Sequence, residues 1–291
     1  MSVGVVLGAG GPLGWAYHLG VLQGVRDSID REPANADRIV GTSAGGAIAA
    51  TLLTGTSTND VLELISSPPS GEDKDKMRAA GTQALQNPIE ALRPVAPGLV
   101  RHVREAGVLT ALVGLLLAGL FPTMFLRRFA EDVPWPNQLW IPSVRLDDGK
   151  TVVFGRDAVS ACLSDAVEAT SAVPGVFQPK MIDGSRYVDG AVASSTHADV
   201  LAPEGHDIVL VSAPMARAGG GPVRIGARRR LTHELDVVRE SGARTLVLIP
   251  NETVLNAADG FPRRKPNAGA GIVEAARLQT IDAFASRTSP S

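Results

Sequence analysis

The stretch Gly41-Thr42-Ser43-Ala44-Gly45 decides the fold of this chain because of what stands on either side of it. The apolar run Arg38–Val40 precedes it, and the small residues of Gly46–Ala50 follow it. This order predicts a serine on a tight turn from a strand into a helix, with glycines where side chains would not fit. The first amides of that helix would face the hydroxyl, so the pattern predicts that Ser43 is an exposed nucleophile.

A second strand-loop-helix unit stands upstream. Val3–Leu7 is a predicted buried strand, Gly8–Gly14 is a glycine-rich loop, and a helical pattern runs from about Trp15 to Arg26. Taken alone, G-x-S-x-G occurs by chance in about one such chain in five, and a plain glycine-rich turn would be the alternative interpretation. The upstream unit favours a functional site, because its glycines would let several backbone N–H groups face one anion.

The spacing of the loop helps to identify that anion. A dinucleotide fingerprint starting at Gly8 and Gly10 requires a glycine at Leu13, but the next glycine comes one position later, at Gly14. A P-loop would need Gly-Lys-Ser or Gly-Lys-Thr, which the chain lacks. The pattern therefore favours the oxyanion of an acyl-transfer intermediate, held by the amides of Gly10 and Gly11.

The base that would activate Ser43 is predicted to be an aspartate. None of the five histidines stands where a triad histidine is expected, and we interpret each as a surface or helix-face residue. They are His18, His102, His197, His206 and His233. Asp189 ends the short apolar run Arg186–Val188 and precedes Gly190, which predicts a carboxylate at the tip of a strand.

These residues resemble the patatin-like phospholipases and lipid acyl hydrolases, a family that uses a Ser-Asp dyad. Four blocks between residues 3 and 215 match in order, and together they are more specific than any one alone. They are Ala9–Gly14, Gly41–Gly45, Ala169–Phe177 and Asp189–Ala191. The resemblance implies that Ser43 is the nucleophile, that Asp189 is its base, and that Gly10 and Gly11 supply the oxyanion hole. Gly14, Gly41, Gly45 and Gly190 complete the motifs.

Two positions depart from the family pattern. Ala9 replaces the first of three glycines, and Leu13 replaces the basic residue before the last glycine of the loop. Ala9 fits only if its φ is negative, and Leu13 removes a cation that could attract anionic headgroups. We still expect hydrolysis, because the amides remain. The alternative is a catalytically weak or inactive lipid-binding, membrane-associated protein on the same fold.

The composition of the chain limits which binding partners and which cellular compartment we expect. With a formal net charge of −2 over 291 residues, the chain has no basic field for nucleic acid. Its single cysteine, Cys162, excludes an intrachain disulfide, fits a reducing compartment and is expected to be a small buried hydrophobe. The chain enters its first strand without a leader-like segment, so we expect a cytoplasmic protein, peripheral to the membrane.

The run from Ala106 to Leu126 contains no charged residue, which is unusual for a segment of a water-soluble protein. Pro122 interrupts it, which disfavours a membrane span. A core helix and a lipid-facing helix remain open, and we favour the lipid-facing one as part of a cap or lid insertion at 66–130.

The remaining pattern alternates strands and helices. Strands are predicted at Leu139–Val144, Thr151–Phe154, Asp207–Ser212 and Thr245–Pro250, and helices at Asp157–Ala169, Ile225–Ser241 and Ala268–Ser286. The sequence thus predicts a single domain, 1–291, with a three-layer α/β/α sandwich and a mainly parallel sheet. We expect a serine acyl hydrolase that forms an acyl-enzyme on lipid esters, without metal or cofactor; the pattern says nothing of oligomeric state.

Overall fold

The structure is a computed structural model, and its described residues form two compact units. They are residues 1–29, 32–57, 60–63, short pieces between 71 and 97, 119, 121–130, 133–217, 219, 221–261 and 268–288. The first unit combines Met1–Ser67 with Ser195–Ser291, and the second is Pro68–Ser194.

The first unit is built on a parallel sheet. Its strands are β1 (Val3–Leu7), β2 (Arg38–Gly41), β7 (Ile208–Ser212) and β8 (Arg244–Leu248). β1 pairs with β2 on one side and with β7 on the other, and β7 pairs with β8. Leu7 is in register with both Gly41 and Ser212, so the loops that follow these three strands begin at the same edge of the sheet.

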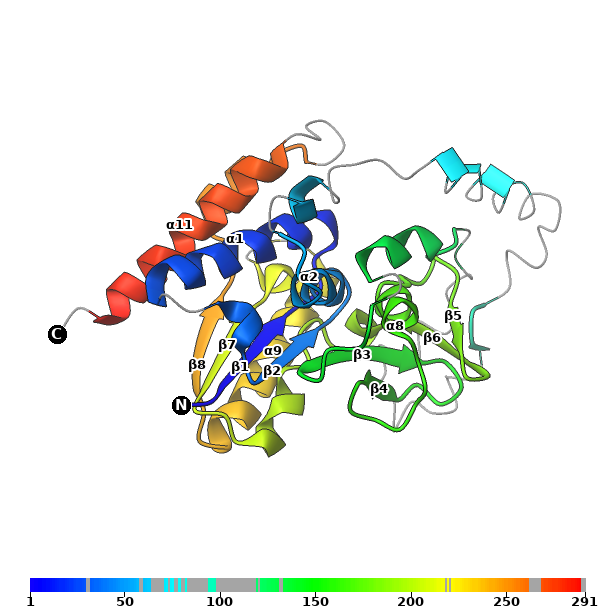
Figure 1. Ribbon diagram of the computed structural model, residues 1–291, viewed down its shortest axis with the longest axis horizontal. Coiled ribbons are helices and arrows are strands. Elements are labelled where there is room, and N and C mark those ends of the chain that lie inside the picture. Colours follow the sequence, from blue (N-terminus) through cyan, green and yellow to red (C-terminus); the bar gives the residue numbers. More distant parts are fainter. Residues whose placement is uncertain are drawn as a thin grey trace. The chain divides into compact units, whose positions relative to one another are not determined.

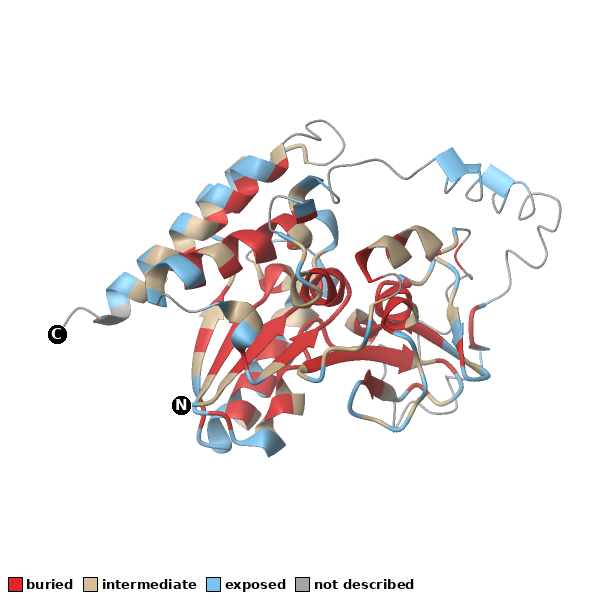
Figure 2. Ribbon diagram, in the orientation of Figure 1, coloured by how far each residue is buried: buried red, intermediate tan, exposed pale blue. Residues whose placement is uncertain are grey.

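Helices cover both faces of this sheet, as the sequence predicts. They are α1 (Gly11–Ile29), α2 (Ala44–Leu53), α9 (Pro222–Glu240), α10 (Glu252–Ala257) and α11 (Gly269–Thr288), with 3-10 turns η1 (Pro33–Asn35), η5 (Ala198–Glu204) and η6 (Pro214–Ala216). Figure 1 shows α1 and α11 side by side. Val3 and Val5 face these two helices, whereas a Cβ on Gly4 would lie 2.9 Å from Leu201 of η5, on the opposite face. Figure 2 shows the strands buried and the outer side of α11 exposed.

The contact between α1 and α11 depends on small residues. A Cβ on Gly24 would lie 2.6 Å from the carbonyl oxygen of Arg277, and one on Gly20 would collide with the carbonyl of Val273. Arg277 also pairs with Asp27 at 2.7 Å. The two helices therefore pack backbone to backbone, in a way that larger side chains would prevent.

The second unit contains an antiparallel sheet. Its strands are β3 (Leu139–Arg145), β4 (Thr151–Phe154), β5 (Lys180–Ile182) and β6 (Ser185–Asp189), and its helical segments are α8 (Leu163–Thr170), η3 (Met124–Phe129) and η4 (Gly190–Val192). β3 pairs with β4 and with β6, and β6 pairs with β5. The predicted fold class, α/β with a mainly parallel central sheet, is confirmed.

Two local predictions in this unit are wrong. The helix expected from Asp157 begins only at Leu163, because Asp157 closes a turn after β4, where its carboxylate accepts the N–H of Val153 at 2.8 Å. Cys162 precedes that helix and is exposed, not buried. Strand β5 and helix α10 were not expected from the sequence.

The predicted cap at 66–130 lies mostly outside the described residues, as does most of the uncharged run 106–126. Across the parts of the chain that are described, no helix combines the length and the apolar character that crossing a bilayer requires.

Candidate active site

Ser43 lies on the turn that the sequence predicts, between β2 and α2. Its backbone has φ 53° and ψ −117°, a conformation that a residue with a side chain rarely adopts. The turn is held by the amide of Thr42, which donates to the carbonyl of Leu7 at 2.9 Å, and by that of Gly45, which donates to Thr42. The strained turn places Ser43 at the carboxyl edge of the sheet. The residue is only 7% exposed, so the prediction of an exposed nucleophile is wrong: the close packing of the turn covers it.

The two glycines of the motif have steric causes. A Cβ on Gly45 would collide with the carbonyl of Leu7 on the neighbouring strand. A Cβ on Gly41 would lie 2.6 Å from the Cα of Gly46, inside the first turn of α2. Any side chain at either position would push the helix away from the sheet.

The glycine-rich loop meets the Ser43 turn at this edge. A Cβ on Gly14 would lie 3.3 Å from that of Ala44, so the start of α1 packs against the start of α2. Gly11 has φ +58° and open space before it. The amides of Gly10 and Gly11 donate no hydrogen bond to the described part of the chain, which leaves them available to an anion. Ala9 is absent from the residues with positive φ, as expected.

His18 fixes the start of this loop from inside the protein. Its Nε2 lies 2.6 Å from the carbonyl oxygen of Gly8, and its Nδ1 lies 2.8 Å from Oγ of Ser212. A carbonyl can only accept, so Nε2 carries the proton and Nδ1 accepts from the serine. Burial lowers the pKa of His18 to about 4, partly offset by the bond to Gly8, so the ring is neutral at pH 7.

A buried segment after β6, Ser195–Ala198, supports both the loop and the turn. The carbonyl of Ser195 accepts the amide of Ala9 at 2.7 Å, and Nδ1 of His197 lies 3.2 Å from Oγ1 of Thr42. Glu234, fully buried on α9, accepts from the hydroxyl of Thr196 at 2.6 Å and from the amide of Ala198 at 3.0 Å. The carboxylate of Glu234 therefore holds the segment Ser195–Ala198 in place. His197 of this segment contacts Thr42, the residue before Ser43.

Asp189 ends β6 in the second unit and is 3% exposed. Its Oδ1 accepts the amide of Ala191 at 2.8 Å, and its own amide donates to the carbonyl of Ala172 at 3.0 Å. Ala172 belongs to the Ala169–Phe177 block, so that block anchors the aspartate. Ser143 is its cross-strand partner on β3. Gly190 begins the 3-10 turn that carries the chain away.

The structure thus brings Ser43, Gly10, Gly11, Gly14, Gly41 and Gly45 together in the first unit, while Asp189 and Gly190 lie in the second. The pairing of Ser43 with Asp189 stays a prediction. Sequence reasoning missed the supporting roles of His18, His197 and Glu234. His18 lies on a helix, as one of the two interpretations allowed, but a surface position is wrong for His18, His197 and His206, because all three are buried. Ser212 lies 194 positions from His18, and Thr42 lies 155 positions from His197, so no local pattern marks these two contacts.

Comparison with known proteins matches the model of one family, and solved structures similar to this chain include the following two. The sequence model of the patatin-like phospholipases matches residues 5–202. VipD from Legionella pneumophila has a TM-score of 0.49 and 14% identity, with 98% of this chain and 66% of VipD covered. The type III effector protein ExoU has a TM-score of 0.46 and 16% identity, with 98% of this chain and 53% of ExoU covered. The chain therefore spans less than two thirds of either protein.

Proposed function

The chain belongs to the patatin-like phospholipase family, a family of lipid ester hydrolases, and from this premise we propose that it cleaves fatty acyl esters of phospholipids or other lipids. The family predicted from the motifs is thereby confirmed. One observation carries the proposal: Ser43 stands on a strained turn at the start of α2, beside a loop whose Gly10 and Gly11 amides make no hydrogen bond with any residue that the structure describes.

In the proposed reaction, Oγ of Ser43 attacks the acyl carbon while its proton passes to the carboxylate of Asp189. The carbonyl oxygen becomes an oxyanion, and the amides of Gly10 and Gly11 donate to it. The intermediate collapses, the alcohol leaves with the proton, and Ser43 holds the acyl group. Water then gives its proton to Asp189 and attacks the ester, which releases the fatty acid and restores Ser43.

The Ser43 assignment is tested by exposing the protein to a fluorophosphonate and measuring its intact mass. We expect one adduct per chain, and none in Ser43→Ala, whose lipase activity should fall at least about a thousandfold. Ser241→Ala, at the exposed end of α9, is the control and should label normally. Labelling of Ser43→Ala would refute the assignment. An unlabelled wild type that still binds lipid would favour the alternative, a lipid-binding protein without turnover.

The role of Asp189 is tested with Asp189→Asn, which keeps the size of the side chain but cannot accept the serine proton. We expect kcat to fall by about a hundredfold or more, with the circular dichroism spectrum unchanged. Asp183→Asn is the matched control, because Asp183 is exposed in the β5–β6 turn. If His197→Ala or His18→Ala retained the fold but lost as much kcat as Asp189→Asn, a histidine base would replace the dyad.

An exposed apolar group in the second unit supports action at a lipid surface. Phe121, Val173 and Val176 are 40%, 40% and 44% exposed. They are adjacent, because the amide of Phe121 donates to the carbonyl of Val176 at 3.1 Å. Phe121 lies within the uncharged run, and Val173 and Val176 belong to the block that anchors Asp189. We therefore place lipid contact at this apolar group.

This lipid contact is tested with Val176→Glu. The variant should lose most of its sedimentation with phosphatidylcholine vesicles and most of its preference for aggregated over monomeric ester, because a charge cannot enter the lipid interface. Hydrolysis of a short soluble ester should stay within about twofold. Val223→Glu makes the same change at a site 65% exposed on α9 and should behave as wild type. Equal losses in both variants would count against the assignment.

A further inference from the structure

The first unit holds a cavity at the edge of its sheet opposite the Ser43 turn. The cavity has a volume of about 480 Å³, within the range of small-molecule sites. It lies at the starts of the strands, whereas Ser43 and the glycine loop follow their ends. The cavity lining reaches Val5 and Leu210, two positions or about 7 Å before the ends of their strands, and includes neither Ser43 nor the glycine loop, so the cavity is distinct from the proposed active site.

The floor of the cavity is one face of the parallel sheet. Strand register places Val3, Ile208 and Arg244 in one row and Val5, Leu210 and Leu246 in the next. Alternate residues of a strand share a face, so both rows point to the same side. Except for Arg244, the floor is aliphatic.

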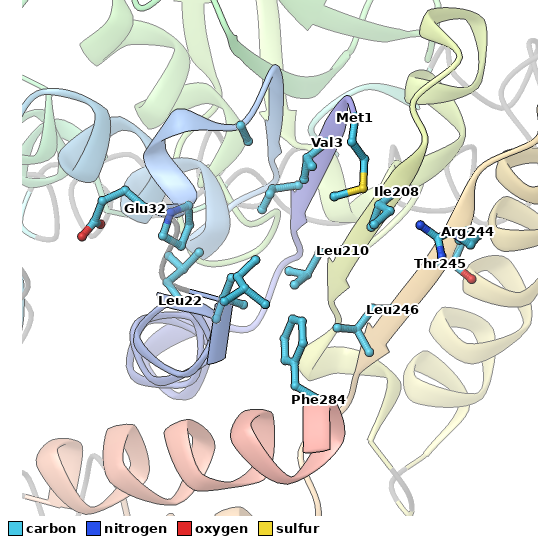
Figure 3. A pocket seen from close by; sticks show the side chains of 15 residues that line it. Met1, Val3, Leu22, Glu32, Ile208, Leu210, Arg244, Thr245, Leu246 and Phe284 are labelled. Carbon is cyan, nitrogen blue, oxygen red and sulfur yellow. The ribbon is translucent and has the colours of Figure 1, made fainter. Parts of the chain in front are cut away.

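The walls come from the two helices that cover this face. α1 contributes Leu22, Val25 and Ile29, and α11 contributes Phe284. Figure 3 shows Leu22 and Phe284 on the helix side and Ile208, Leu210 and Leu246 along the strands. The result is a mainly apolar space that an unbranched hydrocarbon chain would fit better than a polar ligand.

The charged side chains at the rim of the cavity differ in whether a bound ligand could reach them. Arg244 is exposed, and its guanidinium makes no hydrogen bond or salt bridge with the described residues. Its charge contributes to lowering the pKa of Asp207, after the larger effect of the hydrogen bond from the amide of Ser2. Its acidic neighbour Asp207 is already engaged by the amide of Ser2 at 2.6 Å. The acidic lining residue, Glu32, directs its carboxylate away from the cavity in Figure 3, and the N-terminal ammonium of Met1 pairs with Asp207 at 3.8 Å. An accessible cation therefore stands at the end of an apolar space.

We propose that this cavity binds one long-chain fatty acid, with its hydrocarbon chain on the aliphatic rows and its carboxylate on Arg244. The proposed function enters only as a source of the ligand, because ester hydrolysis would release such an acid. Apolar burial supplies the affinity, and the guanidinium selects a carboxylate over a neutral head.

The proposal is tested by titrating the full-length Ser43→Ala protein with lauric, myristic and palmitic acids below their aggregation limits, using calorimetry. We expect one site per chain and an affinity that rises about fourfold per added methylene until the cavity is full. Arg244→Gln should weaken the acids about fivefold and leave the matching fatty alcohols unchanged. Arg229→Gln, exposed on α9, should change neither.

A second variant tests the cavity itself. Val25→Phe places a larger side chain into the wall and should reduce binding of both acid and alcohol, with thermal unfolding used to verify that the protein is folded. Equal acid affinities in wild type, Arg244→Gln and folded Val25→Phe would overturn the proposal. So would loss of binding after a fluorophosphonate occupies Ser43 of the wild type, which would locate the acid in the active site. Hydrolysis is measured separately, so its failure would leave this result interpretable.

Discussion

At the scale of single residues, the chemistry of this site depends on backbone conformations that few side chains tolerate. Ser43 keeps a positive φ because Gly41 and Gly45 let β2, α2 and β1 approach closely on either side of it. Such strain persists only where the surrounding structure fixes it. The surroundings here include buried polar groups, among them His18, whose hydrogen bonds to Gly8 and Ser212 depend on the protonation state of its ring.

The protonation of His18 predicts how stability depends on pH. Its pKa is about 4 in the folded protein and about 6.5 in an unfolded chain. The unfolded state therefore binds more protons between these values. Stability is unaffected by this group above pH 6.5 and falls as the pH drops toward 4, by about 3 kcal/mol in all.

The measurement is urea unfolding at several pH values between about 4 and 7. His18→Gln should flatten the pH dependence, because a glutamine can donate to Gly8 and accept from Ser212 without titrating. His233→Gln, exposed on α9, is the control and should keep the wild-type slope. The same slope in wild type and His18→Gln would contradict this account.

At the scale of elements, one ion network joins η3 to α8 and β5. Glu168, 3% exposed, accepts from Thr123 at 2.7 Å, from Arg127 at 3.1 Å and from Lys180 at 2.9 Å. Asp165 binds the same two cations at its more exposed position. Nearby cations lower the pKa of Asp165 against the opposing effect of burial, which is the larger single contribution. The network fixes α8, and α8 leads into Ala172, whose carbonyl accepts the amide of Asp189.

Removing the buried charge should therefore cost more than removing the exposed one. Glu168→Gln removes the buried carboxylate from Lys180 and Arg127, which keep the more exposed Asp165, and we expect a loss of about 3 kcal/mol in the free energy of unfolding. Asp165→Asn should cost about 1 kcal/mol or less. Urea unfolding of both variants, monitored by fluorescence, measures the difference. Equal losses would mean that burial of Glu168 does not set the strength of the network.

Elements also differ in how far the sequence predicts them. Apolar runs and glycines mark β1, β2, β7 and the Ser43 turn, because strand burial and tight turns act through neighbouring residues. The start of α8 was missed because Asp157 bonds to its local backbone instead of capping a helix. Contacts such as Thr42 to His197 form only after the chain has folded, so their roles cannot be predicted from spacing.

At the scale of the whole molecule, the charges nearly cancel. Lys and Arg number 28 against 30 Asp and Glu, so the long-range field is weak. We therefore predict that vesicle binding depends on apolar contact and changes less than about twofold between about 0.05 and 0.5 M salt. Sedimentation with neutral and anionic vesicles measures this. A steep loss with salt on anionic vesicles alone would instead indicate a local basic surface.

The first unit is assembled from two segments that are far apart in the chain, and this affects how the protein folds during its synthesis. The second unit is continuous and can fold while later residues are still being made. Asp27, in contrast, must wait for Arg277, 250 positions later. At usual rates of translation that delay is roughly 10 to 50 s. Throughout it, the face of α1 that packs on α11 stays uncovered, so newly made chains should depend on chaperones until α11 leaves the ribosome.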